Sequence, residues 1–115
     1  MSVSASFKEF LIEQMAGFSP VTIRPMFGGA GVYHDGLMFA LAADEVLYLK
    51  VDEASRPAFI AENLPPFVYS RKDQKIDMSY FRSPERCMDD VDEMAIWCRT
   101  AYGAALNAAR KKPKK

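Results

Sequence analysis

Four acidic residues, Asp89, Asp90, Asp92 and Glu93, form the densest group of potential metal ligands or acid–base catalysts in the sequence. A calcium-binding loop spaces its oxygen ligands over about twelve residues around a central glycine, and this group contains no glycine. Acidic side chains in the first turn of a helix are favoured by capping and by the helix dipole. We therefore interpret the group as the start of a helix and predict no metal site there.

Gly28, Gly29 and Gly31 raise the question of a phosphate-binding loop, because glycine-rich backbone can wrap around phosphate groups. The Walker pattern needs Gly-Lys-Ser/Thr opening a helix, and the dinucleotide fingerprint needs a strand before the glycines and a helix after them. Here a strand-like segment follows the glycines. We predict no cofactor and expect the glycines to permit a β-bulge or the close approach of another element.

His34 and the two cysteines offer no complete catalytic or metal-binding set. No Cys, His or carboxylate cluster at ligand spacing surrounds His34, so we interpret it as a surface turn residue. Cys87 and Cys98 do not form a Cys-x-x-Cys pair, and Cys98 lies on an apolar helical stripe where cysteine acts as a small hydrophobe. Without a nucleophile–base pair to argue from, we expect no enzymatic activity.

Two basic groups are the candidates for contact with nucleic acid or a partner. Arg71, Lys72 and Lys75 lie in a predicted protruding loop, for which an ordinary solvated turn is the alternative interpretation. Residues 110–115 hold five of the fifteen basic residues and none of the fifteen acidic ones, so the rest of the chain carries a net charge of −5. We expect this tail to stay unfolded and either to contact phosphates without sequence preference or to aid solubility. Its basic residues are Arg110, Lys111, Lys112, Lys114 and Lys115.

Three short strands and two tight turns are predicted between Arg24 and Val51. Asp35-Gly36 is typical of a type I′ hairpin, in which both central residues have positive φ, and Asp44-Glu45 marks a second reversal. A further short edge strand over 21–23 is a weaker expectation.

The middle strand of this meander is apolar on both faces, so we expect it to be covered on both sides or central in its sheet. Alternation predicts two sets of side chains on opposite faces. One set is Leu37, Phe39 and Leu41, and the other is Met38, Ala40 and Ala42.

Three helices follow from apolar residues at helical spacing. The first spans about 6–16, from a Ser6-x-x-Glu9 capping box to a stop at Gly17. The second starts near Ser55, so that Pro57 falls in its first turn, and buries Phe59, Ile60 and Leu64. The third spans about 90–109. Its predicted apolar stripe is Val91, Met94, Trp97, Cys98, Ala101, Ala105 and Ala108, with Leu106 beside it.

A second hairpin, over 67–70 and 76–81, completes the predicted elements. Short connections demand antiparallel pairing, so the predicted class is α+β: about five strands packed by three helices in the order α-β-β-β-α-β-β-α. The 115 residues form one domain over 1–109, followed by the basic tail. No run approaches the ~20 apolar residues of a membrane span, and no secretory signal is visible. These features indicate a cytoplasmic protein with free thiols.

Four sequence blocks resemble the N-terminal domain of the TfoX/Sxy family. They are Arg-Pro-Met-Phe-Gly-Gly-Ala-Gly-Val-Tyr at 24–33, Asp-Gly-Leu-Met-Phe-Ala-Leu at 35–41, Leu-Tyr-Leu-Lys-Val-Asp at 47–52 and Met-Ser-Tyr-Phe-Arg-Ser-Pro-Glu at 78–85. The resemblance extends from about Phe7 to Ala109 and implies a two-layer α+β domain without catalytic residues.

The resemblance also implies a bacterial regulator, because the best-known family members are transcriptional co-activators in natural competence that act with a DNA-bound activator. Those regulators have a second, helical C-terminal domain, whereas this chain ends in Arg-Lys-Lys-Pro-Lys-Lys. We therefore expect a regulatory protein-interaction module. The alternative is a small, non-specific DNA-binding protein that uses the 71–75 loop and the tail.

Overall fold

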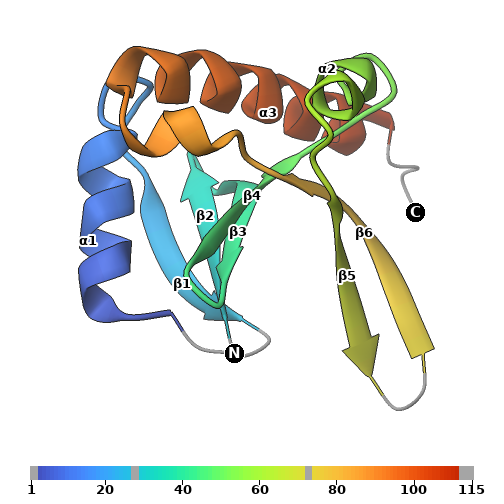
Figure 1. The fold of residues 1–115 in the computed structure, drawn as a ribbon, viewed down its shortest axis with the longest axis horizontal. Coiled ribbons are helices and arrows are strands. Elements are labelled where there is room, and N and C mark those ends of the chain that lie inside the picture. The colour runs from blue at the N-terminus through green and yellow to red at the C-terminus, as the bar shows by residue number, and fades with distance from the viewer. Residues whose placement is uncertain (1–2, 27–28, 72–73, 112–115) are drawn as a thin grey trace.

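The computed structural model describes residues 3–26, 29–71 and 74–111, with the backbone alone described for 68–71, 74–78 and 111. Helices cover one face of an antiparallel six-stranded sheet (Figure 1), which confirms the predicted α+β class. In chain order the elements are α1 (Ala5–Gln14), β1 (Thr22–Met26), β2 (Gly29–His34), β3 (Leu37–Ala43), β4 (Val46–Lys50), α2 (Arg56–Ala61), β5 (Pro66–Arg71), β6 (Gln74–Arg82), the 3-10 helix η1 (Glu85–Met88) and α3 (Val91–Lys111).

The strands are arranged in the order β1-β2-β3-β4-β6-β5. The expectation of about five strands was one short, because Thr22–Met26 pairs along its whole length with β2 as a full edge strand. Tight hairpins join most neighbours, but β4 and β6 pair although α2 and β5 lie between them in the chain. β3 and β4 are therefore central, as the two-sided apolar pattern of the middle strand predicted.

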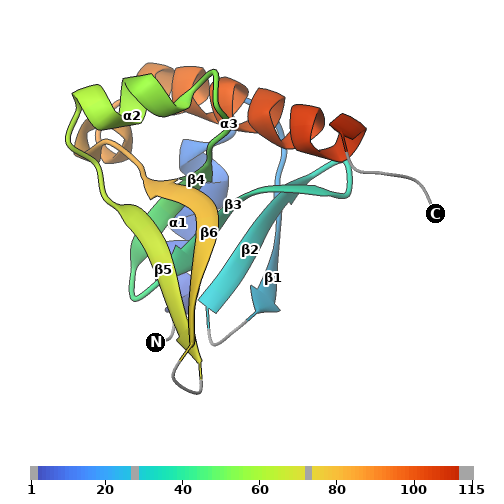
Figure 2. The same ribbon diagram turned by 90° about the vertical axis from the view of Figure 1, so that its right-hand side faces the viewer.

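The main core lies between the helices and one face of the sheet (Figure 2). Its large, fully buried side chains come from the three α-helices, the C-cap of α1 and strands β2 to β4: Leu11, Met15, Val32, Phe39, Leu47, Leu49, Phe59, Met94 and Cys98. Three residues predicted to be buried are instead exposed, namely Ile60, Val91 and Ala108. α2 is short and buries Phe59, while Val91 and Ala108 lie near the two ends of α3.

A β-bulge in β3 changes which side chains share a face. Tyr33 pairs with Met38 and Val32 pairs with Ala40, so Phe39 is an extra residue between two ladder partners. Both Phe39 and Ala40 consequently contribute to the helix-side core, and Leu41 is moved to the opposite face. The two predicted sets were therefore wrong beyond Phe39, because a bulge resets the alternation. Leu41 shares a face with Met38, whereas Ala40 and Ala42 share the helix-side face with Phe39.

Both predicted tight turns of the meander are confirmed. Asp35 and Gly36 have φ values of 52° and 76°, and Asp44 and Glu45 have φ values of 53° and 62°. Positive φ at both central positions is the signature of a type I′ turn, whose twist matches that of the flanking strands. In the second turn neither residue is glycine, so the chain adopts a left-handed conformation that is costly for L-residues.

The second turn also caps α1, which starts one residue before the predicted start. The N-cap is Ser4, whose hydroxyl accepts a hydrogen bond from the Phe7 backbone N–H at 3.1 Å. The Glu45 carboxylate accepts from the Ser4 backbone N–H at 2.9 Å and from the Ser4 hydroxyl at 2.7 Å. The predicted Ser6–Glu9 capping box is thus replaced by a box whose acidic member comes from the β3–β4 turn.

The start of α3 is capped as the acidic cluster predicted. The Asp90 carboxylate accepts from the backbone N–H groups of Asp92 and Glu93, at 2.9 and 3.3 Å. The helix ends later than predicted, at Lys111, so Arg110 and Lys111 are helical rather than part of an unfolded tail. Within the described ranges, no helix is both long and apolar enough to cross a membrane.

Candidate functional site

One face of the sheet has no helix packed over its centre, and we call it the open face. Its apolar cluster consists only of strand residues: Leu41, Ala43, Phe67 and Tyr80, with the half-buried Met38 and Tyr48 packed against them. The sheet curls so that Phe67 in β5 approaches Tyr48 in β4, with ring centroids 4.9 Å apart. Figures 1 and 2 show the β5–β6 hairpin and the β1–β2 hairpin extending away from α3.

Cationic and aromatic side chains line the open face beside this cluster. The Arg24 guanidinium lies 5.3 Å from the centre of the Tyr33 ring, and the Lys50 ammonium lies 5.1 Å from the centre of the Tyr80 ring. Lys50 and Tyr80 are directly paired between β4 and β6, as Tyr33 and Met38 are between β2 and β3. Each of these two cations therefore lies against an aromatic ring of the neighbouring strand.

Gly31 is required by the packing on this face. A Cβ at this position would lie 2.8 Å from the Met38 sulfur and 3.0 Å from the Met26 sulfur and the Tyr33 ring. Gly29 approaches the backbone even more closely, since a Cβ there would overlap the carbonyl oxygen of Ala42. These two glycines confirm the expectation of a close approach, whereas Gly28 lies outside the described residues.

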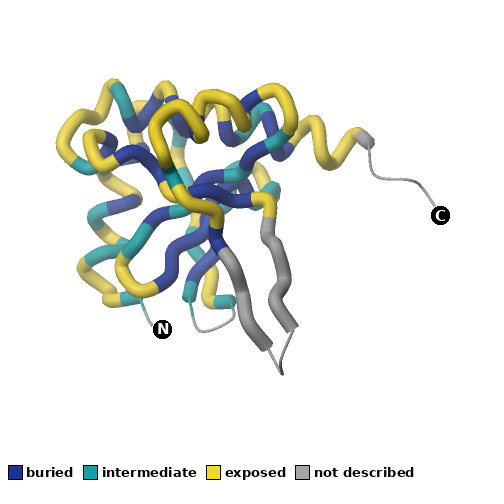
Figure 3. Tube along the Cα trace, turned by 45° about the vertical axis from the view of Figure 1, so that its right-hand side comes forward, coloured by how far each residue is buried: buried dark blue, intermediate teal, exposed yellow. Residues whose placement is uncertain are grey.

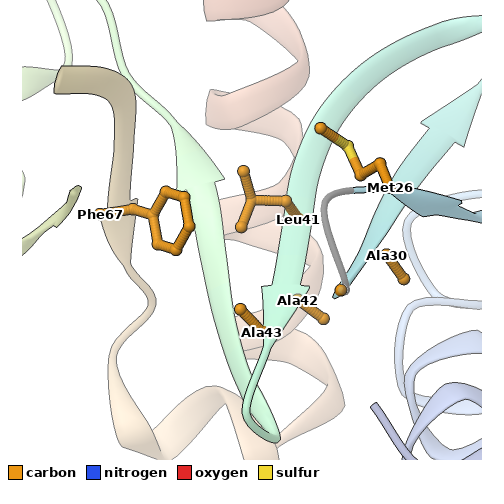
Figure 4. A pocket seen from close by; sticks show the side chains of 7 residues that line it. Met26, Ala30, Leu41, Ala42, Ala43 and Phe67 are labelled. Atoms are coloured by element: carbon orange, nitrogen blue, oxygen red, sulfur yellow. The ribbon is translucent and has the colours of Figure 1, made fainter. Parts of the chain in front are cut away.

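A small apolar hollow lies next to Gly29, between the edge of β1 and Phe67 (Figure 4). Its volume of about 10 Å³ is sufficient for no more than one water molecule. The hollow is therefore a packing feature of the open face and is too small for an organic ligand. It is lined by Met26, Gly29, Ala30, Leu41, Ala42, Ala43 and Phe67.

A larger hollow lies beside the last turns of α3, at the start of β3 and the end of β4, and we call it the α3 hollow. Its volume is about 320 Å³, and its lining consists of Leu37, Met38, Lys50, Tyr80, Ala105, Ala108 and Ala109. Burial raises the pKa of Tyr80 to about 12, with a smaller contribution from the nearby Tyr33. The Tyr80 phenol is therefore neutral near pH 7.

The basic residues predicted as contact candidates fall into two separate places. Arg71 ends β5 and Lys75 lies in β6, so both are strand residues and the predicted loop is shorter than expected. Arg110 is exposed at the end of α3, and Lys111 is the last helical residue. Figures 1 and 2 place the end of β5 and the start of β6 well apart from the end of α3. Lys72, Lys112, Lys114 and Lys115 lie outside the described residues.

His34 is not the exposed turn residue that was predicted. It is the last residue of β2, and its ring Nδ1 donates to the Pro20 carbonyl at 2.9 Å. The ring packs edge-on against Phe18 and Tyr102, with centroids 5.5 and 5.1 Å away. Only 22% of the side chain is exposed, so His34 joins the β2 end to α3 as part of an aromatic cluster.

The Arg86 ion-pair cluster and the two cysteines occupy structural positions in the described part of the chain. Arg86 donates two hydrogen bonds to Glu62 and one to Glu93, all within 2.9 Å, and Trp97 also donates to Glu93. Burial raises the pKa of the Cys87 and Cys98 thiols to about 12, which makes both poor nucleophiles. Within residues 3–26, 29–71 and 74–111, no group of three His, Cys, Asp or Glu residues could hold a metal ion.

Sequence reasoning missed the open-face residues Arg24, Tyr33, Lys50 and Tyr80. Part of this face can be predicted from the sequence, because Tyr48 and Lys50 alternate with Leu47 and Leu49 along one strand and so share its other side. The other part was not, because the pairing that places Lys50 beside Tyr80 joins strands thirty residues apart in the chain.

The chain matches the family model of the TfoX N-terminal domain over residues 13–105. No curated protein matches it. The matched segment starts at the end of α1, includes strands β1 to β6 and α2, and ends within α3. The chain therefore belongs to the TfoX N-terminal domain family.

Proposed function

We propose that the chain is a cytoplasmic regulatory module of the TfoX type, which controls transcription by binding a protein partner such as a DNA-bound activator. Membership of the family supports a regulatory or competence-related role. The proposal assigns no reaction to the chain and requires no cofactor.

The observation that carries the proposal is the open face. Methionine and tyrosine side chains lie there half-buried, without a helix over the centre of the cluster: Met26, Tyr33, Met38 and Tyr48. Methionine adapts its shape to different partners, and tyrosine combines apolar area with a polar hydroxyl, as is common in protein interfaces. A partner that covers this face would bury these side chains.

DNA binding is the second candidate function, and the basic hairpin and helix end support it. Arg71 and Lys75 lie at the far end of the β5–β6 hairpin, and Arg110 is exposed near the end of α3. Since these groups lie far apart, each would contact phosphates on its own. Such contacts give weak binding without sequence preference.

Pull-down of the tagged protein from an extract of its own cells, with and without nuclease, distinguishes the two candidates. Three proteins are compared: the wild type, Met26→Glu on the open face, and Ile96→Glu on α3. Ile96 is 49% exposed on the outer surface of α3, so it is a matched control for adding a charge at an apolar surface position.

The proposal predicts a partner that survives nuclease, is lost with Met26→Glu and is retained with Ile96→Glu. Circular dichroism should show that both variants are folded. A partner that disappears after nuclease treatment would favour the DNA-binding alternative. A nuclease-resistant partner bound equally by all three proteins would refute the role of the open face.

A further inference from the structure

The outer surface of α3 carries a row of residues at regular spacing, which we call the α3 seam. Successive members are separated alternately by four and three positions, which is the spacing of the a and d positions in a coiled coil. The members are Asp92, Ile96, Arg99, Gly103, Leu106 and Arg110. Gly103 is half-buried and the other five are exposed. Ile96 and Leu106 are therefore large apolar side chains that the described part of the chain leaves at the surface.

Gly103 lies near the middle of this 21-residue helix, where glycine is among the least favourable residues. Packing within the molecule does not require it, because a Cβ at this position would meet no atom within 4 Å. A glycine on the surface of a helix lets another element approach the backbone closely. Gly103 therefore suits a surface that a second helix covers.

The last turns of α3 extend past the core. Residues 106–110 are all exposed (Figure 3). Most of the stability of a helix in a protein comes from the packing of one face rather than from its own hydrogen bonds. A helix laid along the α3 seam would add such packing to this exposed end.

The charges of α3 make the helix complementary to itself in the antiparallel direction. Asp89 and Asp92 are exposed near its start, whereas Arg110 is exposed near its end and is followed by four lysines in the sequence. Neither Asp92 nor Arg110 forms an ion pair within the described residues. A parallel second copy of α3 would bring like charges together, whereas an antiparallel copy pairs each acidic start with a basic end.

A single register satisfies the apolar and the charged positions together. Ile96 and Leu106 are equally far from Ala101 in the sequence, in opposite directions. Asp92 and Arg110 are also equally far from Ala101. A two-fold axis at the level of Ala101 consequently places Ile96 against Leu106 of a second copy. The same axis places Asp92 against Arg110 of that copy.

We propose that two copies of this chain associate through the α3 seam, with the two helices antiparallel about a two-fold axis at the level of Ala101. In this arrangement Arg99 crosses Gly103 of the second copy, where the missing side chain leaves room for the aliphatic part of arginine while its charged end stays in water. The seam faces away from the sheet, so the open face of each copy stays uncovered. The inference does not depend on the proposed function, because it is tested on the purified protein alone.

Sedimentation equilibrium of the purified full chain in low-salt buffer, over a range of concentrations, tests the proposal. The seam has two large apolar side chains per copy, and a contact of this size gives a weak complex. We therefore expect a monomer–dimer equilibrium with a Kd in the micromolar range. Dimerisation should weaken as the salt concentration rises, because exposed charges pair across the interface. A protein that stays monomeric up to about 500 μM, well above such a Kd, would overturn the proposal.

Three substitutions locate the interface, and two-fold symmetry makes each change in the seam act twice. Ile96→Glu should weaken dimerisation about tenfold or more, because it places a charge at an apolar contact. Gly103→Arg should weaken it to a similar extent, because it adds bulk and positive charge opposite Arg99 of the second copy. Arginine is a better helix former than glycine, so this variant should fold. Ile12→Glu is the matched control on α1, at an isoleucine that is 44% exposed, and should leave dimerisation unchanged.

A charge exchange tests the antiparallel register itself. Asp92→Arg and Arg110→Glu should each weaken the homodimer, because each brings like charges together at both ends of the interface. An equimolar mixture of these two variants should restore dimerisation as a heterodimer, because opposite charges then meet at both ends.

Circular dichroism establishes that each variant is folded. A folded Ile96→Glu or Gly103→Arg protein that dimerises as the wild type does would overturn the proposal. A mixture of the charge variants that associates no better than each variant alone would overturn the antiparallel register. A monomeric wild type that captures another protein through the seam in the pull-down, with loss of that protein in Ile96→Glu, would assign the seam to a different partner and also overturn the proposal.

Discussion

At the scale of single residues, Gly36 shows how one backbone angle determines a hairpin. Its φ of 76° lies in the left-handed region, and a Cβ at this position would meet no atom within 4 Å. A substitution there would consequently test backbone strain without any steric clash. The neighbouring Asp35 also has positive φ, and aspartate tolerates this conformation better than most residues do.

We predict that Gly36→Val lowers the free energy of unfolding by about 1–2 kcal/mol, because a β-branched residue is strained at positive φ. Chemical denaturation followed by circular dichroism measures the change. Gly36→Asn is the matched control and should be affected much less, since asparagine adopts this conformation more readily. An unchanged stability of Gly36→Val would contradict the type I′ turn.

At the scale of secondary-structure elements, the Ser4–Glu45 contact joins α1 to the β3–β4 turn. The hydrogen bonds from Ser4, the hydroxyl first and the backbone N–H second, hold the pKa of Glu45 below its ordinary value of 4.5. A carboxyl group with a lowered pKa in the folded state stabilises the protein above its ordinary pKa. That stabilisation is lost as the pH falls through the lowered, folded-state value.

We predict that Glu45→Gln makes stability less sensitive to acid below pH 4.5 than it is in the wild type. Denaturation curves measured from neutral pH down to the acid range test this, with Glu9→Gln as a control for removing an exposed carboxylate near α1's start. Ser4→Ala should produce the same loss of acid sensitivity as Glu45→Gln, and the double variant should add little to it. Identical acid profiles for wild type and Glu45→Gln would show that this contact is not maintained in solution.

The elements predicted correctly from the sequence are those specified by local interactions. The Asp35-Gly36 turn, the start of α2 at Ser55 with Pro57 in its first turn, and the Asp90 cap of α3 depend on residues close together in the chain. The errors arise from distant contacts. Ser4 replaces Ser6 as the cap because Glu45 reaches it from forty-one residues away.

The candidate site was less predictable than the fold for the same reason. The bulge at Phe39 moves Leu41 to the open face, and alternation alone gives no sign of an extra residue. Lys50 and Tyr80 meet only because β4 pairs with β6. The basic residues were visible as a composition bias, but their separation in space depends on where the hairpin and α3 end.

At the scale of the whole molecule, this separation of basic groups limits any DNA binding. Electrostatic binding by about five phosphate contacts would give a slope of roughly −4 to −5 in log K against log salt, with Kd in the range of roughly 10⁻⁴ to 10⁻⁶ M. Truncation after Lys111 removes Lys112, Lys114 and Lys115 and leaves α3 at its observed length.

We predict that the protein binds unrelated duplexes with equal, weak affinity and that this truncation makes the salt slope shallower by about 2.7, or about 0.9 for each lysine lost. Fluorescence anisotropy across a salt series measures both quantities. Arg24→Gln, which removes a cation from the open face, is the control and should change the slope little. Nanomolar binding to one sequence that survives high salt and truncation would identify a true DNA-reading protein instead.

The order of the strands also has a consequence for how the chain folds in time. The four strands of the meander and the two strands of the β5–β6 hairpin can each form from neighbouring segments, which is fast. Joining them requires Leu49 to meet Phe81 and Lys50 to meet Tyr80, and this closes a loop that contains α2 and β5. Loop closure costs entropy before the contact is made, so docking of the hairpin onto the meander is expected to be the slow step. The open face and the α3 hollow both contain Tyr80 of β6, so each surface is complete only after the hairpin has docked.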